Sequence, residues 1–316
     1  MSQYPGEDWA SIKQRILSGV DQRPAFQGRV VTGGRLNARN TVTGMQPPVI
    51  QSVSVTPTYA TPGTTITFSA TAHDPDGSIV SMAWEFGDGS SATGDSASHQ
   101  YGGIGGYFAT FRAVDDDGNE AVAGVWIAVA NADTVLLVDD DGNTSASDST
   151  EFSFEPALAA RGIEYVRVES ALDLPPALPN PVIWNTGFQY SGTLTGPEQA
   201  WLSAFLDAGG RLYLSGEDIL YELTGATDGP VDGFAREYLH VHSVVNDVGT
   251  RTLAGVPGDP ITDGMSVQLA LADGFSDVIV PEGSAAGILV GDDGEFTALR
   301  YYTGNYRLVF GAFAFE

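Results

Sequence analysis

The sequence predicts a multidomain protein in which an all-β sandwich precedes an α/β domain with a doubly wound sheet. Up to about residue 131, short alternating strands are separated by turns rich in Pro, Gly and Asp. The run Thr134–Val138 is continuously apolar, as in a strand buried on both faces, and strands and helices alternate after it. We therefore expect a short N-terminal region at 1–45, a sandwich at 46–131 and an α/β domain at 132–316.

Composition excludes several classes of function. Forty acidic residues against fourteen basic ones give a net charge of −26, which repels nucleic acid and anionic lipid and attracts cations. No apolar run is long enough to span a membrane, and no leader segment is visible, so we expect neither a membrane span nor a signal peptide in this sequence. The absence of Cys excludes disulfides and thiolate chemistry, and four His argue against a zinc enzyme.

The N-terminal region has too little apolar material for a core of its own. Ile12, Ile16 and Leu17 share one helical face, and Val30-Val31 predicts a short strand, so this region needs a partner surface. Residues 5–42, which include Gly-Gly-Arg-Leu-Asn-Ala, resemble the last stretch of subtilisin-like serine protease domains. None of that family's catalytic motifs is present, so the resemblance implies an upstream serine protease domain as a partner and assigns no proteolysis to these residues.

Four apolar residues precede a glycine-rich turn in the sandwich region. Val80, Met82, Trp84 and Phe86 fall at spacing two, which predicts one buried face of a strand, with Trp84 as a core anchor. Gly87-Asp88-Gly89 then allows the positive φ values that a tight reversal requires.

These residues carry a family resemblance. Trp84 to Ser90, followed by His99-Gln100-Tyr101, Gly106-Tyr107 and Val114 to Asn119, resembles the PKD domain over about residues 47–130. The resemblance implies an immunoglobulin-like β-sandwich that serves as a spacer or binding module in extracellular proteins. It provides no active site to transfer.

Two turns of the sandwich are rich in carboxylates. One contains Asp74 and Asp76, and the other contains Asp115, Asp116 and Asp117. Oxygen-rich loops suit Ca²⁺, which takes six to eight oxygen ligands. Asp is also preferred in turns because its side chain bonds the local backbone, so both a Ca²⁺ site and a purely structural turn are open.

The C-terminal region alternates strands and helices. A helix is expected near 150–161 and a second one after the capping box Thr195-Gly196-Pro197-Glu198, and strands are expected near 287–290, 297–302 and 306–313. Taken together, residues 132–316 resemble the class I glutamine amidotransferase-like fold, a flavodoxin-like doubly wound sheet. Domains of this kind occur downstream in secreted proteases.

The carboxyl ends of the predicted parallel strands gather polar residues where ligands bind in such sheets. Asp139 and Asp141 are candidate ligands for Ca²⁺ or Mg²⁺, with solvated loop carboxylates as the alternative. Ser215 is a weak candidate nucleophile, with His240 and His242 downstream. The turn lacks Gly-x-Ser-x-Gly, and His240-Val241-His242 alternates like a strand, so we expect no catalytic residue.

Aromatic residues give the remaining route to function. Trp126 lies off the apolar face of its strand, and Tyr301, Tyr302 and Tyr306 cluster near the C-terminus. Such rings can stack on sugars or on peptide surfaces, and interdomain packing is the alternative.

These observations predict a non-catalytic accessory and binding region of a secreted subtilisin-like protease, or its remnant, that positions extracellular protein or polysaccharide. The alternatives are a hydrolase that uses Ser215, a peptidase-associated fragment whose activity comes from a missing upstream domain, and a purely structural surface protein. The expected location is extracellular or at the cell surface.

Overall fold

The computed structural model describes two compact units. The described residues are 8–22, 32, 34–36, 38, 45–140, 151–187, 192–225, 228–246, 248, 250–269, 276–302 and 304–313. Unit 1 comprises residues 1–129 and unit 2 comprises residues 130–316, a division two residues before the boundary that the sequence predicts. In the described part of the chain, no helix has the length and apolar character needed to cross a membrane.

A short helix and a hairpin begin unit 1. The helix α1 (Trp9–Ser18) starts at Asp8, whose carboxylate accepts a hydrogen bond from the Ser11 amide at 2.8 Å. The strands β1 (Val20–Gln22) and β2 (Gly34–Leu36) then pair antiparallel. The helix that the apolar spacing predicts is present, but none of its residues is buried. The predicted strand at Val30-Val31 lies outside the described residues.

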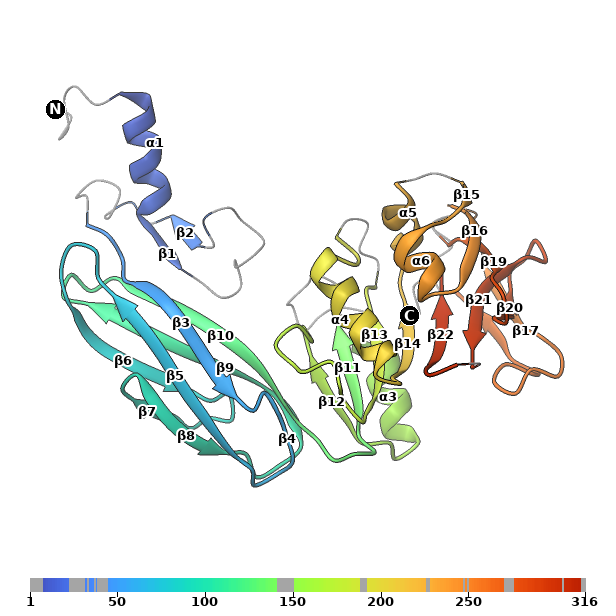
Figure 1. The fold of residues 1–316 in the computed structure, drawn as a ribbon, viewed down its shortest axis with the longest axis horizontal. Helices are drawn as coiled ribbons and strands as arrows, with labels where there is room; N and C mark the ends of the chain where they lie inside the picture. The colour runs from blue at the N-terminus through green and yellow to red at the C-terminus, as the bar shows by residue number, and fades with distance from the viewer. Residues whose placement is uncertain are drawn as a thin grey trace. The chain divides into compact units, whose positions relative to one another are not determined.

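The rest of unit 1 is a β-sandwich of two antiparallel-paired sheets (Figure 1). The three-stranded sheet has the order β3-β5-β8 and the five-stranded sheet the order β4-β10-β9-β6-β7; only β4 pairs parallel, with the end of β10. The strands are β3 (Val49–Thr56), β4 (Tyr59–Ala60), β5 (Thr65–His73), β6 (Ile79–Glu85), β7 (Ser91–Thr93), β8 (Ser96–Gln100), β9 (Gly105–Asp115) and β10 (Glu120–Val129).

Aromatic rings from both sheets fill the sandwich core. Trp84 is fully buried and meets Phe68 at 5.2 Å and Phe111 at 5.1 Å between ring centroids, so the predicted core anchor is confirmed. The prediction for Val80 is wrong, because its side chain is 62% exposed. A register shift between Ile79 and Ser81 interrupts the alternation, and Ile79 packs against the core instead.

Unit 2 is built on a nine-stranded sheet whose first five strands are parallel neighbours. Their order, β12-β11-β13-β14-β22, places the second strand outside the first and is the flavodoxin-like order of a doubly wound fold. Antiparallel strands extend the sheet beyond β22 in the order β21-β20-β17-β18. The strands are β11 (Val135–Asp139), β12 (Tyr165–Val168), β13 (Pro181–Asn185), β14 (Arg211–Ser215), β17 (Thr252–Gly255), β18 (Ser266–Gln268), β20 (Ala286–Val290), β21 (Phe296–Tyr301) and β22 (Arg307–Gly311).

Helices cover both faces of this sheet. On one face, Phe154 of α3 (Glu151–Ala160) meets Tyr213, and on the other, Trp201 of α4 (Gly196–Asp207) meets Trp184. The predicted capping box at the start of α4 is confirmed. The remaining elements are α5 (Ile219–Thr224), α6 (Gly233–Glu237) and a small sheet of β15 (Gly229–Pro230), β16 (Val241–Val245) and β19 (Val278–Pro281).

Candidate functional site

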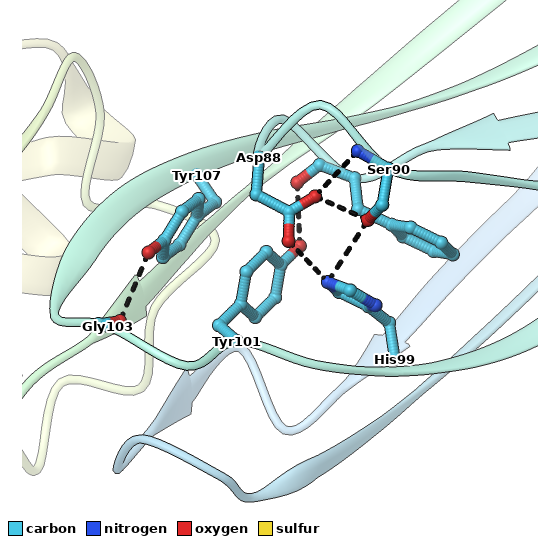
Figure 2. Close-up of polar contacts among 7 residues, drawn as sticks. Asp88, Ser90, His99, Tyr101, Gly103 and Tyr107 are labelled. Carbon is cyan, nitrogen blue, oxygen red and sulfur yellow. Dashed lines mark hydrogen bonds and ion pairs between the residues drawn. The ribbon is translucent and has the colours of Figure 1, made fainter.

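A carboxylate and a hydroxyl of the turn between β6 and β7 cluster with an imidazole on β8, as Figure 2 shows. The Asp88 carboxylate accepts hydrogen bonds from the Ser90 amide at 3.0 Å and from the Ser90 hydroxyl, and its second oxygen lies 2.7 Å from His99 Nε2. The His99 ring stacks on Phe86 at 4.3 Å. Tyr101 closes the cluster by donating its hydroxyl to the Phe86 carbonyl at 2.8 Å.

Ser90, His99 and Asp88 do not form a catalytic triad. In a triad the carboxylate holds one imidazole nitrogen while the serine faces the other. Here Asp88 and Ser90 both face Nε2, at 2.7 and 3.4 Å, and a carboxylate only accepts, so Nε2 must carry the proton. Burial would raise the pKa of Asp88, but the bonds from Ser90 and His99 lower it overall. The cluster therefore ties the turn to strand β8.

An aromatic pair lies on the outer face of the five-stranded sheet. Trp126 and Phe108 are opposite each other on β10 and β9, with ring centroids 5.1 Å apart, and both are half-buried. Their core-facing neighbours Ile127 and Ala109 are fully buried. The Phe108 ring extends over Gly124, where an added Cβ would lie 2.2 Å from the ring. A part-exposed aromatic surface results, in which the two rings are tilted by 42° to each other, and we call Phe108, Gly124 and Trp126 the aromatic platform.

The two carboxylate-rich turns of the sandwich lie beside each other. Oxygens of Asp74 and Asp116 both come within 2.6 Å of the place that a Cβ on Gly77 would take. Asp116 also accepts a bond from the Ser78 amide at 2.7 Å.

Three of the predicted ligands in these turns, Asp74, Asp76 and Asp115, accept hydrogen bonds from backbone amides. Asp115 is buried and accepts from the Asn119 amide at 2.7 Å, and Asp76 accepts from the Gln46 amide at 3.2 Å. Asp117 is half-buried beside them. Among the described residues, no three His, Asp or Glu side chains are grouped so that they could hold a metal ion. The Ca²⁺ site stays a prediction.

The carboxyl edge of the parallel sheet brings together several predicted residues. Asp139 and Asn185 are register partners, as are Asn185 and Ser215. The buried Asp139, which we predicted as a metal ligand, forms an ion pair with Arg167 through one carboxylate oxygen at 2.7 Å, and the metal site stays a prediction. Asp141 lies outside the described residues.

Ser215 is fully buried at the end of β14. Its hydroxyl donates to the Asn185 side-chain oxygen at 3.4 Å, a long bond to a residue that is not a base. The turn to α5 reaches its left-handed backbone conformation three residues later, at Asp218, with φ of 54°. A positive φ is uncommon outside glycine, so Asp218 rather than Ser215 lies at the sharp point of this turn.

The two predicted binding tyrosines near the C-terminus have different surroundings. Tyr301 stacks on His240 with ring centroids 3.6 Å apart, so its ring faces protein. Tyr302 is 39% exposed and lies against the Arg300 guanidinium at 5.1 Å.

His240 is half-buried and immediately precedes strand β16, whereas His242 is exposed and lies in the strand. His240 adopts a positive φ of 55°, and its Nε2 lies 2.8 Å from the Tyr306 hydroxyl. Burial lowers the pKa of His240, an effect that Glu282 partly opposes, and burial raises the pKa of Tyr306. No local pattern indicates this contact, because it joins residues that are 66 positions apart.

Comparisons with known proteins identify the sandwich. The family model of the PKD domain matches residues 45–129. A microbial collagenase from Vibrio alginolyticus is 45% identical over 62 residues, which is 19% of this chain and 8% of the collagenase. The matched stretch therefore covers only a small part of that relative's length.

Solved structures are similar to parts of this chain, with low TM-scores. The PKD1 domain of Vibrio anguillarum Epp is 28% identical, covers 27% of this chain and 95% of its own, and has a TM-score of 0.23. A glutamine amidotransferase from Thermotoga maritima is 11% identical, covers 58% of this chain and 76% of its own, and has a TM-score of 0.35. The motif residues, the sandwich topology and the family model agree that residues 45–129 form a PKD domain.

Proposed function

We propose that this chain is a non-catalytic accessory and binding region of a secreted subtilisin-like protease, and that it positions extracellular protein or polysaccharide for a linked enzyme. The PKD domain and its similarity to part of a microbial collagenase support a protease-associated binding role. In this proposal, residues 1–45 adjoin the protease domain, and unit 2 is an amidotransferase-like fold that serves as an accessory domain. Such a region raises the effective concentration of substrate at the enzyme.

The aromatic platform is the observation that carries the binding role. Trp126 and Phe108 lie on the sheet face that turns away from the core, yet they stay together at 5.1 Å. Gly124 leaves room for the Phe108 ring, which a Cβ at this position would meet. Part-exposed, preorganised rings bind sugar or peptide faces at low entropic cost, since they have few rotatable bonds.

An adsorption assay tests the proposal. The whole chain is mixed with insoluble extracellular proteins and polysaccharides, and the protein left in solution is measured. We expect depletion of the wild type and a loss of about tenfold in affinity for Trp126→Ala or Phe108→Ala, since removal of an anchor ring costs about 1–3 kcal/mol.

Trp9→Ala is the matched control, because Trp9 is 74% exposed on α1 and lies outside the platform. Gly124→Ala is a second probe, since its methyl group must displace the Phe108 ring without removing an aromatic residue. The proposal would be contradicted if every platform variant adsorbed as strongly as the wild type. It would also be contradicted if Trp9→Ala weakened adsorption as much as the platform variants do.

A further inference from the structure

An apolar groove crosses the amino-terminal halves of four strands of unit 2. It has a volume of about 330 Å³ and is lined by residues of β11, β13, β14 and β22. Ile183, Tyr213 and Val309 are register neighbours on the sheet face that α3 covers, and all three are only half-buried. Phe154 of α3 reaches the Tyr213 ring at 5.7 Å, so the helix covers this face in part.

Two arginines lie side by side at this groove. Arg211 and Arg307 are register partners on the adjacent strands β14 and β22, and both are exposed. Within the ranges that the structure describes, neither forms an ion pair; Arg211 donates one bond to the Pro179 carbonyl at 3.2 Å. Like charges on neighbouring strands repel each other.

Four other arginines of this chain, which has 40 acidic residues, pair with carboxylates. Arg112, Arg167, Arg236 and Arg300 each contact a carboxylate within 2.9 Å. The guanidinium groups of Arg211 and Arg307 are therefore available to an anion that comes from outside. The net charge of −26 repels anions, and the two positive charges of Arg211 and Arg307 reduce this repulsion at the groove.

An exposed ring completes the groove. Tyr302 lines it together with the arginines, and its ring is held against Arg300, which Asp259 binds at 2.6 Å. The groove thus offers an aromatic and aliphatic floor beside two guanidinium groups. A ligand that fits has an apolar part with a carboxylate directly attached.

We propose that this groove binds the free carboxyl end of a peptide whose last side chain is apolar. Arg211 and Arg307 hold the terminal carboxylate through charge-assisted bonds, and the last side chain lies on Ile183, Tyr213 and Val309. A volume at the low end of ligand pockets suits one or two side chains. The inference rests on the proposed function, since each cut by a linked protease creates a new carboxyl end.

Calorimetric titration of the whole chain tests this site. The probes are N-acetyl-Ala-Leu-Leu with a free carboxyl group, the same peptide as its C-terminal amide, and octanoate, all at about 0.15 M salt. We expect the free acid to bind at least tenfold more tightly than the amide, because the amide cannot pair with the two guanidinium groups. Octanoate has the carboxylate without the peptide, and we expect it to bind more weakly than the peptide acid.

Two variants assign the site. Arg211→Gln with Arg307→Gln should bring the affinity for the free acid down to that for the amide, and Tyr302→Ala should weaken both peptides equally. Arg251→Gln is the control, since it removes one exposed arginine charge outside the groove. Thermal unfolding verifies that each variant is folded.

Equal affinity for acid and amide, or an unchanged acid preference in the double variant, would overturn the proposal. Octanoate binding as tightly as the peptide acid would overturn the assignment to peptide ends. None of these variants touches the aromatic platform, so adsorption through Trp126 and binding at the groove can fail separately.

Discussion

Replacing His99 with alanine tests whether the cluster around Asp88 is structural. The change removes the 2.7 Å contact with Asp88, worth about 1.5–3 kcal/mol for a bond to a charged group. It also removes the stack on Phe86, worth about 0.5–1.5 kcal/mol. The side chains of His99 and Asp88 are 18% and 25% exposed, so solvent screens the pair only in part. We expect the sandwich to lose about 2–3 kcal/mol of unfolding free energy.

Urea unfolding of the whole chain, followed by tryptophan fluorescence, measures this loss in the transition of unit 1. His73→Ala is the control, because His73 is exposed at the end of β5 and should change stability by less than about 0.5 kcal/mol. An unchanged midpoint for His99→Ala would refute the structural role. A variant that keeps its stability and loses adsorption would show that His99 acts in binding instead.

Three further predictions concern acid stability and local packing. The folded-state pKa of Asp88 is lowered, so the ionised carboxylate stabilises the fold fully above the ordinary carboxyl pKa of about 3.9. This contribution to the unfolding free energy is lost as the pH falls through the lower folded-state pKa. In Asp88→Asn, the urea midpoint should therefore fall less steeply with acid than in the wild type. Gly255→Ala should lower the free energy of unfolding by about 3 kcal/mol, because the new methyl group would clash with the Thr262 carbonyl oxygen. Gly196→Ala is the control: its methyl group would meet no atom within 4 Å, so the urea midpoint should change little. Glu198→Ala should lower the free energy of unfolding by about 1 kcal/mol, because the Glu198 carboxylate accepts a hydrogen bond from the Thr195 amide at 2.6 Å. Glu198→Gln keeps an acceptor oxygen and should lose less stability. Equal losses in the two variants would contradict the capping role.

Local pattern was enough to predict the main elements of both units. Alternation at Met82 and Trp84 identified the core face of β6, and the capping box at Thr195 identified the start of α4. The alternation pattern gave a wrong prediction at Val80, because a register shift inserts an extra residue in β6 that the local sequence pattern does not reveal.

Long-range pairing limited the prediction of sites. The rule for parallel sheets correctly placed Asp139 and Ser215 at one edge, where both are register partners of Asn185. It could not show that Arg167, from the neighbouring strand, pairs with one oxygen of Asp139.

The aromatic platform and the groove both form because strand pairing brings residues that are distant in sequence together. Alternation along β9 turns Phe108 away from the core, but only the pairing register of β9 and β10 places it opposite Trp126. Arg211 and Arg307 are likewise distant in sequence and become neighbours because β22 inserts beside β14. Both surfaces depend on register, which composition and spacing do not determine.

The central claim is that this chain positions material for another enzyme and carries out no bond cleavage itself. The most direct measurement is turnover of peptide and ester substrates by the purified whole chain, beside the Ser215→Ala variant. We predict no turnover above buffer for either protein, while the same wild-type sample adsorbs to its insoluble target. Turnover by the wild type that Ser215→Ala abolishes, in a variant that still unfolds at the wild-type midpoint, would contradict the account and favour a hydrolase.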